Sequence, residues 1–344
     1  DNVTSDNLSV NSFTIDTTPP ALAVTTLVPS LTKDNTPNYT FSSNEAGNIT
    51  YGGSCSSSTS AASADNNTIT FNTLQDATYS NCTITVRDNA SNTSDNLTVN
   101  QFTIDTTGPV LDNVTNVPTP SSDNTSSYSF NSNEPGDITY GGSCESTTSK
   151  AVVGTNNITF NALADDTYNN CTVTVTDNLS NASSLSVNTF KIDTTDPIVT
   201  EITAVTTPGN DTTPSYTFHS TEAGNITYGG SCSSSDNSTS GGNKSIDFRK
   251  PNGAVLDEGS YGTGTCTIRV TDGAGNQSNR LDVSSFIIDT TAPTVDSVYP
   301  ANNQNGVSIT TDNISVTFSD ANAMDNNSVT SNTSDTSCSG SFQL

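Results

Sequence analysis

The sequence is organised by the stretch Phe102-Thr103-Ile104-Asp105-Thr106-Thr107-Gly108-Pro109. The pattern Phe-x-Ile-Asp-Thr-Thr-x-Pro occurs four times in the 344 residues, with its isoleucine at positions 15, 104, 192 and 288. The copies are therefore 89, 88 and 96 residues apart. A pattern that returns at nearly constant spacing marks one structural unit per period. Units of this length have the size of a small domain.

Between the copies, short segments alternate apolar and polar residues, as in Thr68-Ile69-Thr70-Phe71 and Thr83-Ile84-Thr85-Val86. A period of two is typical of half-buried β-strands. Gly, Asn, Asp and Pro residues separate these segments, and each unit has room for about seven short strands. The sequence therefore predicts an all-β fold of tandem immunoglobulin-like Greek-key β-sandwiches, arranged as an elongated rod.

Each unit also carries the pattern Leu-x-acid-x-x-Tyr before its sixth expected strand. The copies begin at Leu74, Leu163 and Leu256 and end at Tyr79, Tyr168 and Tyr261. This pattern predicts a tyrosine corner, in which the tyrosine hydroxyl binds the backbone a few residues upstream. Its expected role is structural.

The three full units resemble the bacterial Ig-like repeats of large surface adhesins. The resemblance is carried best by Asp272-Gly273-Ala274-Gly275-Asn276 and Ile288-Asp289-Thr290-Thr291-Ala292-Pro293. The units at Asp88 and Asp177 depart from the first motif, because both of its glycines are replaced there. The segment 294–344 resembles a different bacterial Ig-like family, marked by Pro300-Ala301-Asn302.

Domain boundaries follow from the repeat and the resemblance together. The predicted order is the last strand of a preceding Ig-like domain at 1–16, Ig-like domains at 17–105, 106–193 and 194–289, and the truncated start of a different bacterial Ig-like domain at 290–344. The chain is thus expected to be a segment of a longer polypeptide.

Composition excludes several classes of function. The formal charge is −26, from 35 acidic and nine dispersed basic residues, so no basic stripe is present to bind nucleic acid. No apolar run approaches the length of a membrane span. With one histidine in the whole chain, at position 219, a Ser-His-Asp set is impossible in two of the three repeats. The acidic residues recur in every unit, as structural groups do, so we expect no enzyme activity.

Seven cysteines fall two to a repeat, with Cys338 left over. In the sandwich, the first cysteine follows the third strand and the second opens the sixth, and these strands are neighbours in one sheet. Two cysteines per repeat are too few for a closed zinc site, so disulfides are favoured. The predicted pairs are Cys55–Cys82, Cys144–Cys171 and Cys232–Cys266. Oxidised cysteines place the chain outside the cytosol, and the expected partner of Cys338 lies beyond Leu344.

Acidic residues recur at three places in each unit: the linker aspartate, a Glu-x-Gly turn and an Asp-x-x-x-Asn turn. Sandwich topology puts both turns at the end where the first strand enters, which is also where the linker aspartate arrives. The expected sets are Asp16, Glu45, Asp88 and Asn92; Asp105, Glu134, Asp177 and Asn181; and Asp193, Glu222, Asp272 and Asn276. Three carboxylates with amide and backbone oxygens suit a Ca²⁺ site.

The resemblance adds that adhesin repeats of this type use Ca²⁺ at domain joints. A second interpretation stays open, because Asp and Asn cap turns without any metal and a solvated Glu needs none. Calcium at these joints is therefore a hypothesis of the sequence and not its only interpretation.

The favoured function is a non-catalytic structural or adhesive stalk segment at a bacterial cell surface, which spaces or presents a distal binding domain. One alternative is a subunit of an extracellular filament, in which copies exchange strands. Another is an accessory region of a large secreted enzyme. The expected partners are neighbouring domains of the same chain and, in the filament alternative, other copies. Neither nucleic acid nor membrane insertion is expected, and the sequence names no ligand.

Overall fold

The structure is a computed structural model that describes residues 6–299, 301, 305 and 315–319. Every regular element in these residues is a β-strand, which confirms the predicted all-β fold class. No described segment forms a helix that could cross a membrane. The chain divides into two compact units: Asp1–Val117, Ser127–Asn161 and Asn170–Asn188 belong to the first, and Pro118–Ser126, Ala162–Asn169 and Thr189–Leu344 to the second.

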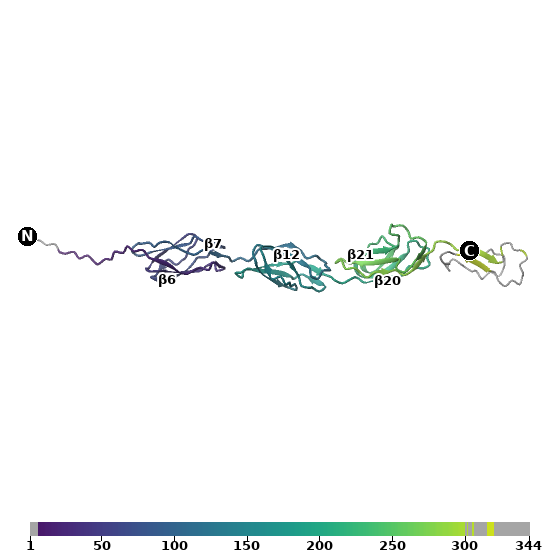
Figure 1. Ribbon diagram of the computed structural model, residues 1–344, viewed down its shortest axis with the longest axis horizontal. Helices are drawn as coiled ribbons and strands as arrows, with labels where there is room; N and C mark the ends of the chain where they lie inside the picture. Colours follow the sequence, from purple (N-terminus) through teal and green to yellow (C-terminus); the bar gives the residue numbers. More distant parts are fainter. Residues whose placement is uncertain (1–5, 300, 302–304, 306–314, 320–344) are drawn as a thin grey trace, which may run out of the picture. The chain divides into compact units, whose positions relative to one another are not determined.

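In the first unit, the residues that follow the first linker form three small sheets (Figure 1). One sheet has the order β1 (Leu22–Thr26), β3 (Asn38–Ser43), β6 (Asp65–Thr70). The second has the order β5 (Ala61–Ala62), β4 (Gly47–Gly52), β8 (Thr83–Arg87), β9 (Leu97–Thr98). The third has the order β2 (Leu31–Thr32), β10 (Phe102–Ile104), β7 (Ala77–Tyr79). Neighbouring strands are antiparallel, except that β10 runs parallel to β2.

The first two arrangements recur further along the first unit. The strands are β11 (Leu111–Thr115), β12 (Ser127–Ser132) and β15 (Gly154–Thr159) in one sheet, and β14 (Lys150–Ala151), β13 (Gly136–Gly141), β17 (Thr172–Thr176) and β18 (Ala182–Ser186) in the other. The same partner order at the same spacing is what a repeated sequence requires.

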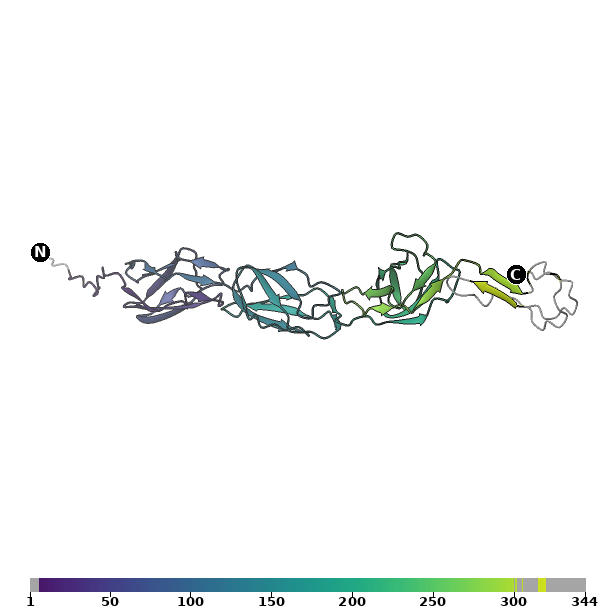
Figure 2. The ribbon, with the colours of Figure 1, turned by 45° about the vertical axis from the view of Figure 1, so that its right-hand side comes forward.

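The second unit begins with the pair β16 (Asp166–Tyr168) and β19 (Phe190–Ile192). Its large sheet has the order β20 (Val199–Thr203), β21 (Ser215–Gly230), β24 (Cys266–Thr271), β25 (Leu281–Asp282), with β22 (Ser238–Asp247) also on β21. Two further pairs are β23 (Gly259–Tyr261) with β26 (Phe286–Ile288), and β27 (Thr294–Tyr299) with β28 (Ser315–Ser319). Figure 2 shows the last pair side by side in yellow-green.

The third repeat differs from the expectation at its Glu-x-Gly position. There the sequence predicts a turn between two strands, as seen between β3 and β4. Instead β21 continues through Glu222, with a shift of register between Ser220 and Ala223. The physical reason is β22, which is long enough to pair on both sides of the shift and so keeps the chain extended.

The buried residues follow the alternation of the sequence. Along β3 and β8 every second side chain is buried, and Tyr39, Phe41, Ile84 and Val86 are fully inaccessible. One buried cluster in the first repeat and another in the third consist of aliphatic and aromatic residues with the disulfide cysteines. Stacked rings such as Phe71 on Phe102 fill their centres. Because a sheet alternates its faces, the lean composition still supplies a continuous apolar layer.

The tyrosine corners are present as predicted. Tyr79 donates its hydroxyl hydrogen to the carbonyl of Gln75 at 3.0 Å. Tyr168 does the same to Ala164 at 3.0 Å, and Tyr261 to Asp257 at 3.1 Å.

The three predicted disulfides are present: Cys55–Cys82, Cys144–Cys171 and Cys232–Cys266, with Cα–Cα distances of 5.3, 5.3 and 5.0 Å. In the first repeat, β4 and β8 are adjacent, and each cysteine lies just beyond the last pair of that ladder, Gly52 with Thr83. Sheet adjacency therefore explains the pairing. Cys338 lies outside the described residues.

Candidate metal sites at the start of each repeat

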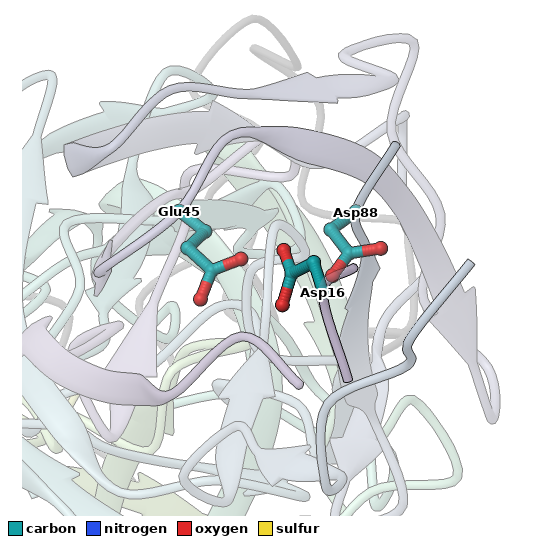
Figure 3. A group of neighbouring side chains, drawn as sticks. All are labelled: Asp16, Glu45 and Asp88. Carbon is teal, nitrogen blue, oxygen red and sulfur yellow. The ribbon is translucent and has the colours of Figure 1, made fainter. Parts of the chain in front are cut away.

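Three groups of carboxylates gather where a linker enters a repeat. Within each group, one oxygen from every residue lies within 4.8 Å of the others. The groups are the first cluster (Asp16, Glu45, Asp88), the second cluster (Asp105, Glu134, Asp177) and the third cluster (Asp193, Glu222, Asp272). Figure 3 shows the first cluster, whose three carboxylates turn toward a common space. The structure thus brings together every acidic residue that the sequence placed in these sets.

The asparagine of each set braces the cluster through its amide nitrogen. In the first cluster, Asn92 Nδ2 donates to the backbone carbonyl of Asp16 at 3.2 Å and to Asp88 Oδ2 at 2.9 Å. Asn181 and Asn276 make the same two bonds in the second and third clusters. The sequence predicts an asparagine oxygen as a ligand, whereas the structure shows the nitrogen tying the linker to the acidic turn.

The turn aspartate is nine-tenths buried or more and is held by its own loop. Asp272 Oδ1 accepts hydrogen bonds from the backbone nitrogens of Ala274, Gly275 and Asn276 at 2.7–2.9 Å. Asp177 accepts from Leu179 and Asn181 in the same way. In the first repeat, where the turn aspartate is Asp88, the hydrogen bond from the Asn92 side chain holds the pKa of that carboxyl below its ordinary value. The loop therefore presents a fixed negative group to the linker.

A buried serine, absent from the predicted set, orients the glutamate. Ser132 Oγ donates to the Glu134 carbonyl at 2.6 Å and accepts from the Glu134 nitrogen at 3.3 Å. Ser43 and Ser220 bind Glu45 and Glu222 alike. A serine stands two residues before the glutamate in all three repeats, which is the sequence signal that would have identified it.

The glycine of Glu-x-Gly lets the two acidic turns approach. A Cβ on Gly136 would overlap the carbonyl oxygen of Thr176, which directly precedes Asp177. Gly47 and Gly224 stand equally close to Arg87 and Thr271. Only glycine lets the two backbone segments approach this closely. The glycine of Glu-x-Gly therefore keeps the glutamate, two residues before it, close to the turn aspartate.

Like charges repel one another in the second and third clusters. Partial burial, with added repulsion from Asp105 and Asp177, raises the pKa of Glu134 above its ordinary value. Burial and the charges of Asp193 and Asp272 likewise raise the pKa of Glu222. Like charges held together favour the neutral acid or an added cation.

The donor set fits Ca²⁺. This ion takes oxygen ligands at roughly 2.3–2.6 Å, so two of its ligands can be up to about 5 Å apart. The observed limit of 4.8 Å lies inside that range. The backbone carbonyl of the linker aspartate, which accepts from Asn181 Nδ2 in the second cluster, is a further oxygen beside the carboxylates.

The third cluster differs, because it contains a cation of the protein itself. Lys191 Nζ forms an ion pair with Asp193 Oδ2 at 2.8 Å. The equivalent position before the linker isoleucine is Thr14 in the first copy and Thr103 in the second.

Comparison with solved structures gives weak likenesses. The Clostridium thermocellum CbhA fibronectin(III)-like modules are 10% identical over 52% of this chain and 94% of their own, with a TM-score of 0.29. The native conformation of E. coli alpha-2-macroglobulin is 9% identical over 78% of this chain and 23% of its own, with a TM-score of 0.17. These scores are too low to transfer any function to this chain.

No curated protein matches the sequence. One family model matches part of the chain. The match lies in the segment whose sequence resembles a different bacterial Ig-like family. Residues 289–342 fit the bacterial Ig-like domain family, which confirms that resemblance.

Proposed function

We propose that the chain is a non-catalytic extracellular segment of a bacterial surface protein, in which consecutive Ig-like repeats form a stalk that spaces or presents a distal binding domain. Ig-like domains are typically structural or adhesive modules, and the family match covers 289–342. Three disulfides suit an oxidising compartment. The stalk, its stiffness and its place at the cell surface are the parts we propose.

One observation carries the proposal. Within the described residues the same carboxylate cluster is built three times, always from the linker aspartate, the glutamate of Glu-x-Gly and the aspartate of the Asp-x-x-x-Asn turn. An active site occurs once in a domain array, whereas a joint must occur at every boundary. A recurring group at the linker therefore supports a role in connecting repeats.

We further propose that each cluster binds Ca²⁺. The bound ion would neutralise three neighbouring carboxylates and draw the linker aspartate toward the two turns, which would stiffen the joint. A divalent cation that binds only the folded state also raises stability by mass action. Stability in calcium is thus the first measurement to make.

The test compares thermal unfolding of the whole chain in calcium and in excess chelator. We expect a higher transition temperature in calcium. Glu134→Gln removes one cluster charge while leaving the Ser132 bonds to the glutamate backbone intact, so it should reduce the calcium effect. Glu145→Gln is the matched control, because Glu145 is exposed and belongs to no cluster. Equal curves with and without chelator would contradict calcium binding.

Stalk formation is tested separately by small-angle scattering and electron microscopy. We expect separate elongated particles. In chelator, their maximum dimension should become shorter or its distribution should become broader. Regular filaments would instead favour the strand-exchange alternative, and a compact particle would refute the stalk.

A further inference from the structure

The acidic residue of the Leu-x-acid-x-x-Tyr pattern binds the linker that leaves its own repeat. Asp165 Oδ1 accepts from the backbone nitrogen of Thr194 at 2.9 Å and from its hydroxyl at 2.8 Å, and Asp165 Oδ2 accepts from the Thr195 hydroxyl at 2.7 Å. Both carboxylate oxygens are therefore engaged with consecutive threonines. None of these residues belongs to a carboxylate cluster.

The arrangement recurs at the linkers that follow the first and the third repeats. Asp76 Oδ1 accepts from the nitrogen of Thr106 at 3.1 Å and from its hydroxyl at 2.9 Å. Glu258 Oε2 accepts from the hydroxyl of Thr290 at 2.6 Å and from that of Thr291 at 2.8 Å. Glutamate and aspartate thus make equivalent contacts, so the charge and its position matter more than the length of the side chain.

Strand register explains why this acid meets the linker. β16 and β19 are antiparallel, and Asp166 lies opposite Ile192. One step outward from that pair, Asp165 precedes β16 and Asp193 follows β19. The same register places Ala77 opposite Ile104 and Gly259 opposite Ile288. The acid therefore lies opposite the linker aspartate just past the end of each ladder, within reach of the first threonine one residue further on.

The tyrosine corner fixes the turn that carries the acid. The Tyr168 hydroxyl binds the carbonyl of Ala164, the residue directly before Asp165. Tyr168 is itself buried and stacks on Phe190 with ring centroids 5.2 Å apart. The core ring therefore positions the backbone of an exposed acidic residue.

The linker is also held from the other side. Asn276 Nδ2 donates to the carbonyl of Asp193 at 2.7 Å, one residue before the bound Thr194. At the preceding linker, Asn181 binds the carbonyl of Asp105, and Asp76 binds Thr106. Consecutive linker residues are thus bound by the repeat that follows and by the repeat that precedes.

From these contacts we propose that Asp76, Asp165 and Glu258 are linker-positioning residues that hold the Thr-Thr pair in one backbone conformation without any metal. We call each acid with its two threonines a linker clamp. Charge-assisted bonds from a carboxylate to a backbone nitrogen and hydroxyls are stronger than neutral ones. Hydrogen bonding also holds the pKa of Asp165 below its ordinary value, in keeping with a carboxylate that is bound while charged.

The clamp goes beyond the proposed calcium function and is tested independently of it. Amide order parameters of Thr194 and Thr195 are measured by NMR on the whole chain in excess chelator. We expect values near the roughly 0.85 of rigid backbone. Asp165→Ala removes all three bonds, so both values should fall below about 0.6, while those of Thr106 and of β17 stay unchanged.

The neighbouring acid supplies the matched control. Asp166→Ala removes an exposed carboxylate that accepts a hydrogen bond from the backbone nitrogen of Thr167 at 2.7 Å, outside the linker, so the order parameters of the linker should not change. Asp165→Glu should retain rigid threonines, because Glu258 makes the same contacts in the third repeat. Should Asp165→Ala fail to fold, Thr194→Val with Thr195→Val removes the hydroxyl bonds from the other partner.

Two results would overturn the clamp. One is mobile threonines in the unaltered chain under chelator, which would mean that the linker needs a metal to be ordered. The other is an Asp165→Ala variant with rigid threonines. Neither result argues against calcium binding, since the cluster residues are left intact in both samples.

Discussion

Lys191 Nζ lies 2.8 Å from Asp193 Oδ2, so an ammonium group already occupies the edge of the third cluster. The Lys191 charge lowers the pKa of Glu222, against burial and the neighbouring aspartates that raise it. The first and second clusters carry a threonine at this position. The three clusters share the same types of acidic residue, but the third also has a positively charged side chain beside the position of a bound cation.

Replacing Lys191 by threonine should strengthen calcium binding at the third cluster, on the order of tenfold, because a nearby positive charge opposes a divalent cation. Isothermal titration calorimetry of the whole chain would resolve the change. Lys244→Thr is the control, since Lys244 pairs with Asp236 outside every cluster. Unchanged affinity after Lys191→Thr would show that the ammonium does not compete.

The Glu134 carboxyl should titrate above its ordinary value when the protein is in chelator. Burial raises its pKa first, and Asp105 and Asp177 add repulsion. The folded state then holds this proton to a higher pH than the unfolded state, so the contribution of Glu134 to stability falls as pH rises through the folded pKa.

The measurement is an NMR titration of the Glu134 side-chain carbon. Asp105→Asn should lower the Glu134 pKa, because one of the two repelling charges is removed. Asp112→Asn is an exposed control substitution in the same repeat. If the Glu134 pKa is unchanged by Asp105→Asn, the proposed repulsion between these two carboxylates is wrong.

Three equivalent core tyrosines should respond differently to loss of their hydroxyl. Tyr216 donates to Glu201 Oε2 at 2.9 Å, whereas within the described residues the buried hydroxyls of Tyr39 and Tyr128 have no hydrogen-bond partner. Tyr216→Phe should destabilise the fold by about 1–2 kcal/mol, and Tyr39→Phe should be neutral or stabilising by about 1 kcal/mol. Denaturant unfolding of each variant checks the sign.

Removing the first disulfide should cost stability. The Cys55–Cys82 bridge closes a loop with a sequence separation of 27, and loop entropy predicts a loss of about 3.5 kcal/mol for the double alanine variant. Chemical denaturation under oxidising conditions measures the loss. The wild-type chain with reductant should approach the stability of a variant that lacks all three bridges, and equal stability of the oxidised and reduced chains would refute the prediction.

The sequence predicts the parts of the fold that depend on local pattern. Alternating residues identify the strands, and fixed motif spacing brings Asp105, Glu134 and Asp177 to one place. The sequence does not reveal the bond from Asp76 to Thr106, because that contact joins residues 30 positions apart and depends on the register of β7 with β10. Register is set by side-chain packing, which spacing alone does not specify.

The third repeat shows a second limit. Its motif matches the other two, and the sequence therefore predicts a turn at Glu222. The outcome depends on β22, which has ten residues where its counterpart β15 has six, and which extends the pairing and removes the turn. A motif is thus interpreted correctly only together with the strand that faces it.

The two attachments of each linker also bear on how such a gene can change. Every repeat contributes the cluster residues that receive the linker before it and the clamp acid for the linker after it. A duplication or deletion with breakpoints at equivalent positions in two repeats would therefore join a clamp to a matching set of turns. Repeat number could vary by unequal recombination between neighbouring copies, without any compensating substitution at the new boundary.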